Sequence, residues 1–516
     1  MTNSGNILWA DDEIDLLKPH ILFLESKGYA VEGVTNGLDA LEMTKKTYFD
    51  IIFLDENMPG LSGLETLTKI KEVDPNVPVV MITKSEEEQI MEDAIGSKIA
   101  DYLIKPVNQN QILISLKKNL NRSKLVSDVT SLNYRKEFRQ LGMQLNNRMD
   151  AIEWSELYSK LVYWELQLDK IEDSGMSEIF EMQKKEANQL FCDFVEENYL
   201  EWLNGIEEGP LFIHNVIKKR ILNSQSTPKT LVLVIDNLRF DQWKVLEPVF
   251  NKYFVKEKEE VVYSILPTAT QYARNAFFAG LMPSEIARKH SEYWKNEEDE
   301  GSKNLYEKDL LEAQLKRLGK NLKWSYNKIT NVDAGKKLNE QFHTLKHNDV
   351  NFIVYNFVDM LSHARTEMEV IRELADDESA YRSITMSWFE HSPLLDIIKQ
   401  AAEEEIRLVI TTDHGTTKVN QPVKIAGERN TNTNLRYKVG RGMGYKSKEV
   451  FVVSNPEDAY LPKQKLSSEF VFAKEQDFFV YPNNYNHFVH YYGNTFQHGG
   501  ISMEEMLIPY VEMRSK

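Results

Sequence analysis

The chain has 516 residues, more than one hydrophobic core usually serves, so we expect two to four domains. Its 42% apolar and 27% charged residues are ordinary for a globular protein and argue against a disordered or fibrous chain. The net charge of −17 argues against passive adhesion of the whole surface to nucleic acid or anionic lipid.

Three features bear on the compartment. The start of the chain, MTNSGNILWADDE, lacks the basic and apolar regions of a secretory signal. No stretch approaches 18 uncharged apolar residues, so we expect no membrane insertion. The single cysteine, Cys192, excludes an internal disulfide and a multi-cysteine metal site, and it fits a reducing environment. We therefore expect a cytoplasmic protein.

Over about the first 120 residues, short apolar runs alternate with amphipathic helical patterns such as LDALEMTKKT and LETLTKIKEV. The apolar runs are NILWA, AVEGV, DIIFLD, PVVMIT and ADYLIK. Five such β–α repeats predict an open, parallel five-stranded sheet, which binds ligands at the carboxyl ends of its strands.

Chemically active residues fall at those strand ends. Asp11 and Asp12 follow the first run, Asp55 ends the third, and Thr83 and Lys105 end the last two. Three carboxylates in one crevice repel each other unless a hard cation such as Mg²⁺ lies among them. The lysine and the threonine hydroxyl could hold a phosphoryl group on one of the aspartates.

This pattern resembles the CheY-like receiver domain of bacterial response regulators over about residues 5–121, and we predict a receiver domain at 1–121. The resemblance implies that Asp11 and Asp12 hold Mg²⁺ and that Asp55 accepts the phosphoryl group. It also implies that the backbone carbonyl of Asn57 completes the metal site and that Thr83 and Lys105 sense the phosphoryl group. Tyr102 matches the aromatic switch of the family.

The second predicted domain, residues 122–225, shows helical patterns and no convincing strand. In AIEWSELYSKLVYWELQLDKI, apolar residues recur every three or four positions. These residues are Trp154, Leu157, Leu161, Trp164 and Leu168. We predict a three- or four-helix bundle whose aromatic stripe is core rather than a ligand site.

The third predicted domain, residues 226–516, returns to strands. The runs LVLVI, NFIVY and IRLVIT read as buried parallel strands of an α/β domain. They deliver Asp236, Asp359 and the adjacent pair Asp413 and His414 to the carboxyl end of the sheet, where such domains build their sites.

Two further histidines complete a set of metal ligands. His363 comes four residues after Asp359, so the two share one helix face, and His498 precedes two glycines. Three aspartates and three histidines suit Zn²⁺, with Mn²⁺ as the nearest rival, and are enough for two metals.

The stretch ILPTATQYARN holds a candidate nucleophile, Thr270, at the predicted start of a helix. Metal coordination lowers the pKa of a hydroxyl, and a helix N-terminus favours anions. The alternatives are that Thr270 is only an N-cap, or that Thr268 is the nucleophile.

This half resembles the PglZ-type branch of the alkaline phosphatase superfamily over about residues 228–512. The resemblance implies two Zn²⁺ per chain and Thr270 as the nucleophile. It implies that Asp236, Asp413 and His414 hold one zinc together with Thr270, and that Asp359, His363 and His498 hold the other. The sulfatase motif C/S-x-P-x-R is absent, and a threonine nucleophile resembles the nucleotide pyrophosphatase/phosphodiesterase branch.

A basic segment, residues 418–448, begins four residues after His414. We hypothesise that its cations guide a polyanionic substrate such as an oligonucleotide, with Arg436, Lys438 and Arg441 as the residues to test. A solvated loop or a dimer contact is the equally weighted alternative. His487 and His490 fit core or surface roles better than metal binding.

The order of the three parts resembles response regulators associated with type IX secretion. That implies phosphorylation at Asp55 by a sensor histidine kinase, a zinc phosphodiesterase acting on cyclic or linear oligonucleotides, and a homodimer formed on phosphorylation. It also implies contact with a sigma factor or a component of the type IX secretion motor. The alternatives are a non-enzymatic regulator with a structural metal site, and a phosphomonoesterase.

Overall fold

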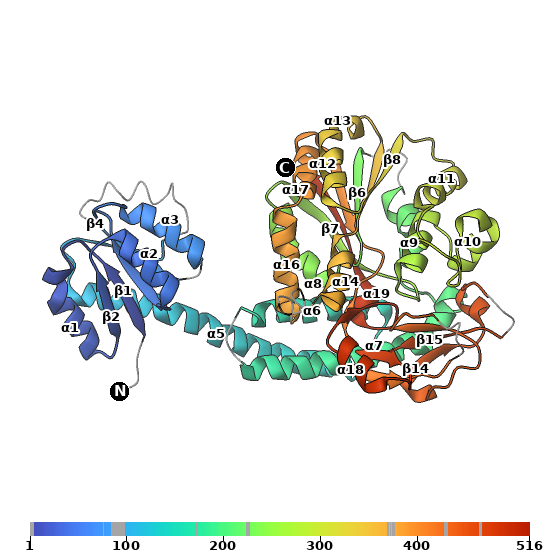
Figure 1. Cartoon of the computed structure of the whole chain (residues 1–516), viewed down its shortest axis with the longest axis horizontal. Helices are drawn as coiled ribbons and strands as arrows, with labels where there is room; N and C mark the ends of the chain where they lie inside the picture. The colour runs from blue at the N-terminus through green and yellow to red at the C-terminus, as the bar shows by residue number, and fades with distance from the viewer. Residues whose placement is uncertain are drawn as a thin grey trace. The chain divides into compact units, whose positions relative to one another are not determined.

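The computed structural model describes residues 5–75, 77–83, 99–170, 174–222, 228–368, 371, 373, 377–427, 432–463 and 467–516. The chain divides into two compact units, Met1–Arg135 and Lys136–Lys516, and Figure 1 colours it from the N-terminus to the C-terminus. Among the helices of the described residues, none is both long and apolar enough to cross a membrane.

The first unit is built on a parallel five-stranded sheet in the order β2-β1-β3-β4-β5, which confirms the predicted α/β fold. All five predicted runs are strands. Their bounds are β1 Asn6–Ala10, β2 Ala30–Val34, β3 Ile51–Asp55, β4 Val79–Thr83 and β5 Asp101–Ile104. The helices of this unit are η1 Ile14–Leu17, α1 Lys18–Ser26, α2 Gly37–Lys46, α3 Gly63–Val73 and the start of α5 Gln109–Leu145.

Alternating side chains of the strands fill two cores, one on each face of this sheet. Ile7 and Trp9 of β1 pack with Leu24 of α1, whereas Leu8 packs with Leu67 of α3. This alternation follows from the two-residue period of a strand. Because helices cover both faces, the inner strands β1, β3 and β4 are buried and largely apolar, and polar side chains are left at their carboxyl ends.

Three long helices follow: α5, α6 Ala151–Leu168 and α7 Ser174–Leu203. The predicted domain boundary at residue 121 falls inside α5, which runs without a break in the described backbone to Leu145. The predicted apolar stripe of α6 is buried, and Trp154 meets Phe191 of α7 with ring centroids 5.5 Å apart, so this stripe is core as expected. Two short turns, η3 Ile213–Asn215 and the π-helical η4 Ile217–Ile221, lead to the next sheet.

The second unit contains a six-stranded sheet in the order β7-β18-β10-β6-β9-β8. The three strands that the sequence predicts lie side by side as β10, β6 and β9, and these strands and β8 are parallel. Next to β10, β18 runs antiparallel to it, and the edge strand β7 runs antiparallel to β18. The bounds are β6 Thr230–Ile235, β7 Phe254–Tyr263, β8 Trp324–Ile329, β9 Val350–Tyr355, β10 Arg407–Thr411 and β18 Leu507–Ser515.

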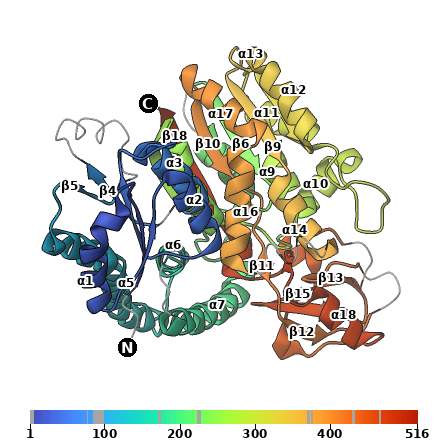
Figure 2. The same cartoon turned by 60° about the vertical axis from the view of Figure 1, so that its left-hand side comes forward.

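Helices lie on both sides of this sheet. Figures 1 and 2 show α16 and α17 on one side and α9, α10 and α11 on the other. The helices are α8 Phe240–Phe250, α9 Thr270–Ala279, α10 Pro283–Lys289, η5 Ser291–Tyr293, α11 Glu307–Arg317, α12 Val332–Glu340, α13 Phe342–Leu345, α14 Phe357–Glu367, α16 Glu378–Glu390 and α17 Pro393–Glu403.

A smaller mixed β region is inserted between β10 and β18. It consists of β11 Thr417–Lys418, β12 Gln421–Lys424, β13 Tyr437–Gly440, η6 Ser447–Glu449, β14 Val450–Val453, η7 Pro456–Ala459, β15 Glu469–Ala473, β16 Asp477–Val480, α18 Tyr485–Tyr492, β17 Phe496–Gln497 and α19 Met503–Met506. The antiparallel pair of β11 and β17 brings the segment after His414 next to the segment that carries His498. This pairing joins residues about 80 positions apart in the chain.

Candidate functional site

The first candidate site lies at the carboxyl ends of β1, β3 and β5. The Lys105 ammonium lies 2.9 Å from Asp11 Oδ2 and 2.9 Å from Asp55 Oδ1. Both aspartates are buried, whereas Asp12 is exposed, and one oxygen of each of the three carboxylates lies within 4.8 Å of the others. Thr83 is buried at the end of β4. The strand ends thus gather the predicted acidic cluster and its lysine.

The Asp55 carboxyl is in an unfavourable environment for a bare charge. Burial raises its pKa, the Lys105 ammonium opposes this effect, and the charge of Asp11 adds to it. Its Oδ2 is buried and makes no hydrogen bond to the residues that the structure describes. A hard divalent cation bound by the three carboxylates would satisfy this oxygen, so the residues present fit Mg²⁺.

The other two predicted receiver residues lie at the margin of this cluster. Asn57 is exposed in the loop after β3, and Tyr102 is half-buried in β5 beside β4. Their predicted roles, completing the metal site and acting as an aromatic switch, remain predictions.

The second candidate site is built from two groups of ligands in the second unit. Asp236 directly follows β6, and Asp413 and His414 come two and three residues after the end of β10. β6 and β10 are neighbours and parallel, so their carboxyl ends meet, and the ligand atoms of these three residues lie within 4.8 Å of one another. We call Asp236, Asp413 and His414 the first ligand set; all three side chains are buried.

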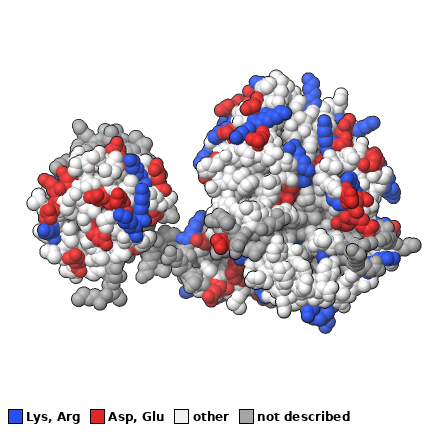
Figure 3. All heavy atoms as spheres, viewed as in Figure 1, with Lys and Arg blue, Asp and Glu red and all other residues white. Residues whose placement is uncertain are grey.

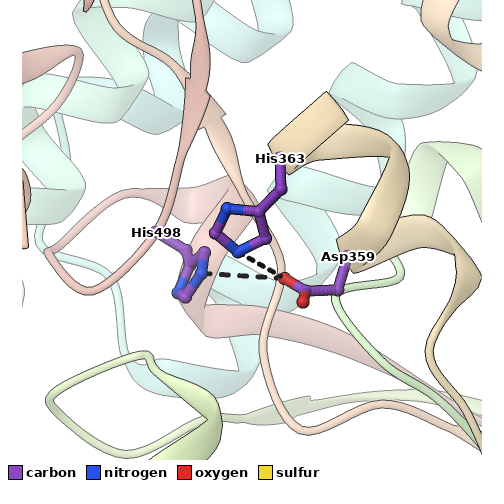
Figure 4. A group of neighbouring side chains, drawn as sticks. All are labelled: Asp359, His363 and His498. Atoms are coloured by element: carbon purple, nitrogen blue, oxygen red, sulfur yellow. Dashed lines mark ion pairs between the residues drawn. The ribbon is translucent and has the colours of Figure 1, made fainter. Parts of the chain in front are cut away.

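The second ligand set is Asp359, His363 and His498, also within 4.8 Å (Figure 4). Asp359 and His363 lie one turn apart on α14, and His498 reaches them from the segment after β17. Asp359 Oδ1 lies 3.6 Å from His363 Nε2 and 3.8 Å from His498 Nε2. The side chain of His363 is 61% exposed, so this set opens to solvent, unlike the first.

The hydrogen bonds of two histidines fix which nitrogen faces the site. His414 Nδ1 lies 3.0 Å from the Gly415 carbonyl, and His498 Nδ1 lies 3.1 Å from the Thr268 carbonyl. A carbonyl only accepts, so Nδ1 carries the proton in each ring and Nε2 offers a lone pair to the site. Burial lowers the pKa of His414 to about 3 and that of His498 well below its ordinary value, so both rings are neutral, as metal ligands must be.

The buried carboxylates of the two sets are suited to divalent cations. Burial raises the pKa of Asp236, Asp359 and Asp413. Asp359 Oδ1 and Asp413 Oδ2 are buried and make no hydrogen bond to any residue that the structure describes. Buried carboxylate oxygens beside neutral imidazoles are the donors that divalent metals take up, so the residues fit a cation such as Zn²⁺ at each set.

Thr270 lies at the edge of the first ligand set. Its Oγ1 is 3.1 Å from His414 Nε2 and 3.5 Å from Asp236 Oδ1. It is the first residue of α9, and the N-cap position belongs to Ala269, so the Thr270 hydroxyl is not used as a helix cap. The hydroxyl therefore lies beside the ligands without serving as the helix cap, and its role as a nucleophile stays a prediction.

The rival threonine is already engaged. Thr268 Oγ1 donates to the Gly500 carbonyl (2.8 Å) and accepts from the Gly499 backbone N–H (3.0 Å), and the side chain is completely buried. This hydroxyl holds the loop that carries His498. The geometry favours Thr270 over Thr268 as the reactive group.

Sequence reasoning missed Arg274, which is buried one helical turn after Thr270. Its guanidinium pairs with Asp236 Oδ2 and, through Nε, with Glu307 Oε1 at 2.7 Å. It also lies 3.9 Å from Asp413 Oδ2. The available signal was the spacing of four residues from Thr270, which places both side chains on one face of α9.

For two of the three residues that we predicted to guide the substrate, burial of the side chain contradicts the prediction. Arg436 is fully buried and bonded to Glu505 (Nη2 to Oε2, 2.6 Å). Lys438 is 1% exposed; its ammonium donates to the Asn432 carbonyl (2.9 Å) and lies 4.7 Å from the centre of the Tyr481 ring. Neither cation can meet a polyanion at the surface. Arg441 is half-buried, and its role stays a prediction.

On the face of the molecule drawn in Figure 3, Lys and Arg are interspersed with Asp and Glu over the described residues and form no single basic track there. Residues 428–431 of the basic segment lie outside the described residues. His487 and His490 are exposed on α18 and belong to neither ligand set, as expected.

The fold and the two ligand sets define an alkaline phosphatase-like domain attached to a response-regulator receiver, and comparisons with known families agree. The family model of the response regulator receiver domain matches residues 7–117, that of the PorX response regulator linker domain matches 124–203, and that of the BREX system PglZ alkaline phosphatase-like domain matches 212–513. The last match covers more than half of the chain, which therefore belongs to the PglZ alkaline phosphatase-like family. The order of receiver, linker and PglZ domain is the PorX-type architecture, as the sequence predicted.

Curated relatives share a smaller part of the chain. It is 37% identical over 121 residues to the transcriptional regulatory protein CpxR homolog of Haemophilus influenzae, covering 23% of this chain and 52% of that protein. It is 32% identical over 126 residues to the phosphoglycerate transport system transcriptional regulatory protein PgtA of Salmonella typhimurium, covering 24% and 30%. The chain thus spans 30% and 52% of the length of these two relatives. A two-component response regulator from Clostridium difficile has a similar structure, with 30% identity, 23% of this chain and 98% of that chain covered, and a TM-score of 0.22.

Proposed function

We propose that the second unit is a phosphodiesterase that requires two divalent metals, Zn²⁺ at both ligand sets, and uses Thr270 as its nucleophile. The observation that carries the proposal is the position of Thr270 Oγ1, 3.1 Å from His414 Nε2 at the start of α9. The bound metals would stabilise negative charge on the phosphoryl oxygens and lower the pKa of the threonine hydroxyl. The PglZ family supports a phosphoesterase-type output.

The reaction proceeds in two steps at Thr270. Its hydroxyl oxygen attacks phosphorus, the bond from phosphorus to the leaving alkoxide breaks, and the hydroxyl proton passes to that alkoxide, so that a phosphothreonine forms that still carries the second ester group. A water oxygen then attacks the phosphothreonine, the bond to Thr270 Oγ breaks, and the hydroxyl regains its proton. The products are an alcohol and a phosphate monoester. Because α9 begins at Thr270, its N-terminus would favour the negative charge of a phosphoryl group held there.

The cations near Thr270 favour a diester over a monoester. Arg274 is paired with Asp236 and Glu307, and Lys328 lies 3.1 Å from Glu307 Oε1, so neither cation is unpaired. A diester carries one negative charge, whereas a monoester carries nearly two and usually needs a further cationic group. Both of these described cations are therefore already engaged by carboxylates.

The test compares a chromogenic phosphodiester with the matching monoester. We expect the zinc-loaded protein to hydrolyse the diester at least tenfold faster, to lose the activity after chelation, and to regain it when Zn²⁺ is restored. Adding Mn²⁺ instead of Zn²⁺ to the chelated protein, and comparing the activity that each metal restores, decides which of the two metals supports hydrolysis. Equal or faster hydrolysis of the monoester would favour a phosphomonoesterase, and zinc binding without turnover of either ester would favour the non-enzymatic alternative with a structural site.

We propose that the receiver controls this output through phosphorylation of Asp55 with bound Mg²⁺. The contact of Lys105 Nζ with Asp55 supports this proposal, because the same ammonium can pair with a phosphoryl oxygen. A sensor histidine kinase of the PorY type would supply the phosphoryl group, and Thr83 and Tyr102 would shift the receiver between two states that set dimer formation.

Replacement of Asp55 tests this second proposal. We expect the wild type to gain one phosphoryl group from acetyl phosphate and Mg²⁺, measured by intact-protein mass spectrometry, and Asp55→Asn to gain none. Asp50→Asn is the matched control, since Asp50 lies at the opposite end of the same strand, where its Oδ2 accepts from the Asn6 N–H. Loss of phosphorylation in the control and its persistence in Asp55→Asn would contradict the assignment.

The PorX-type architecture supports a place in the control of type IX secretion. In this proposal the substrate is a cyclic or linear oligonucleotide in the cytoplasm, and the regulator contacts a sigma factor or a component of the secretion motor. Arg441 is the remaining candidate for contact with the oligonucleotide.

A further inference from the structure

A buried ion-pair network connects the linker helices to the domain that carries the two ligand sets. At its centre is Arg382 of α16, which is 3% exposed. Its guanidinium lies 2.7 Å from Glu165 of α6 and 2.7 Å from Asp241 of α8, and it also bonds to Asp169 just after α6. One side chain therefore holds the end of a linker helix and the start of α8 together.

The network continues from α8 into the loop that bears Asp236. Asp241 Oδ1 accepts from Arg239 Nε at 2.9 Å, and Arg239 lies only three residues after Asp236. Between them, the Asn237 N–H lies 3.4 Å from Asp413 Oδ1, and the Leu238 N–H donates to Thr412 Oγ1 (3.1 Å). A displacement of Arg239 would thus move the backbone that fixes both carboxylates of the first ligand set.

Asn237 makes this loop sensitive to such a displacement. Its φ is +65°, in the left-handed region, and its side chain is completely buried. A non-glycine residue holds that conformation only where its surroundings impose it. The anchoring of Arg239 on one side and of Asp413 on the other is part of what imposes it.

A second route runs from α7 to His414. Asn188 accepts from the Met503 N–H (3.0 Å) and donates to Glu504 (3.2 Å), and Lys184 lies 2.9 Å from Glu165 and 3.4 Å from Glu504. The backbone at 504–505 lies against Gly415, the residue whose carbonyl accepts from His414 Nδ1.

The fit of Gly415 against this backbone is tight. Its N–H donates to the Glu505 carbonyl at 3.0 Å, and a Cβ at Gly415 would lie 2.0 Å from the Glu504 oxygen. A movement of α7 that displaced Glu504 would therefore displace Gly415 and the adjacent His414. Between Glu504 and Gly415 the contact is made by backbone atoms, without a flexible side chain. Both routes end at the first ligand set.

We propose that Arg382 and Lys184 are positioning residues through which the linker helices α6 and α7 set the geometry, and so the metal affinity, of the first ligand set. The inference rests on the proposed function only in taking Asp236, Asp413 and His414 as metal ligands. In this proposal, a rearrangement of α6 or α7 changes the affinity of the first ligand set for its metal. Groups that orient metal ligands typically contribute 10- to 100-fold to metal affinity or activity.

Zinc titration of the metal-free full-length chain against a chromogenic chelator tests the proposal without using activity. For the wild type we expect two bound ions. For Arg382→Met we expect one of the two affinities to fall about 10- to 100-fold. Glu165→Gln, which removes only the charge on the α6 side, should change the same affinity in the same direction, and Arg382→Lys should restore part of it. In parallel, kcat for a diester should fall while KM stays within twofold.

The matched control is Arg220→Met. Arg220 pairs with Glu260 at 2.5 Å in the same unit, and neither residue lies in a ligand-bearing loop. Both of its zinc affinities should stay within twofold of the wild type. Wild-type affinities in both Arg382→Met and Glu165→Gln would overturn the inference, and Glu165→Gln alone decides if Arg382→Met does not fold. A wild type that binds no zinc would instead refute the proposed function.

Discussion

Thr270→Ala is expected to lower phosphodiester hydrolysis by the zinc-loaded protein by at least about a thousandfold. The hydroxyl lies 3.1 Å from His414 Nε2 and 3.5 Å from Asp236 Oδ1, and removing it removes the atom that would bond to phosphorus. The loss should appear in kcat more than in KM, because binding of the diester depends on the metals and on the N-terminus of α9, which remain. Steady-state rates with a chromogenic diester, at matched zinc content, measure both constants.

Thr270→Ser is the matched variant, since it keeps the oxygen and removes only a methyl group. It should retain measurable turnover and should form a covalent phosphoserine, still carrying the second ester group of the substrate, that acid quenching traps. Full activity of Thr270→Ala with two zinc ions bound would contradict the nucleophile and would indicate direct attack by water. Loss of one zinc ion in Thr270→Ala would instead show that the hydroxyl serves mainly as a ligand, which is why the metal content must be measured in every variant.

The ligand sets were predictable because strand order and chemistry coincide. Asp236 and Asp413 follow apolar runs that could only be buried strands, and the carboxyl ends of neighbouring parallel strands must meet. Asp359 and His363 were predictable as a pair from their spacing on a helix. His498 was a candidate from the two glycines that follow it, but its assignment to the second ligand set depended on the resemblance to a known superfamily, because the pairing of β11 with β17 that brings it to the site cannot be read from local sequence.

The groups behind the ligands were not predictable, for a physical reason. Arg274 and Glu307 meet across 33 residues, and Arg382 meets Glu165 across 217. A single sequence shows that these side chains are charged but not that they are buried, and burial decides whether a charge has a fixed partner. The predicted boundary at residue 121 lies within α5, since a helical pattern by itself does not indicate where one compact unit ends.

The basic segment shows the same limit. A run of Lys and Arg after His414 reads as a surface for a polyanion when partners cannot be seen. In the structure Arg436 lies inside the small β region, where its Nε and Nη2 bond to Glu505 at 3.2 Å and 2.6 Å and its Nη2 donates to the Ile501 carbonyl at 3.2 Å. Its position implies a contribution to stability instead of substrate contact.

Arg436→Met is therefore expected to destabilise the second unit by about 3–5 kcal/mol, the cost typical of leaving one partner of a buried ion pair uncompensated. The side chains of Arg436 and Glu505 are both completely shielded from solvent. Urea unfolding of the full-length chain, followed by tryptophan fluorescence, measures the change. Arg220→Met is the control: its ion pair with Glu260 is partly exposed, and such pairs contribute at most about 1 kcal/mol.

The other hydrogen bonds of Glu505 link this loss of stability to the candidate site. They also allow a structural role of Arg436 to be distinguished from substrate contact. Glu505 also accepts from the Gly500 N–H (2.9 Å) and from Ser502 Oγ (2.7 Å), so an unpaired Glu505 would disturb the loop that follows His498. Arg436→Met combined with Glu505→Leu removes both charges and should recover part of the lost stability, because no buried charge is then left alone. If Arg436 has a structural role, Arg436→Met should lose the same fraction of its turnover on a small diester and on an oligonucleotide. Both rates are measured at urea concentrations below the unfolding transition of the variant. A selective loss on the oligonucleotide, with stability unchanged, would instead return Arg436 to the substrate-binding surface.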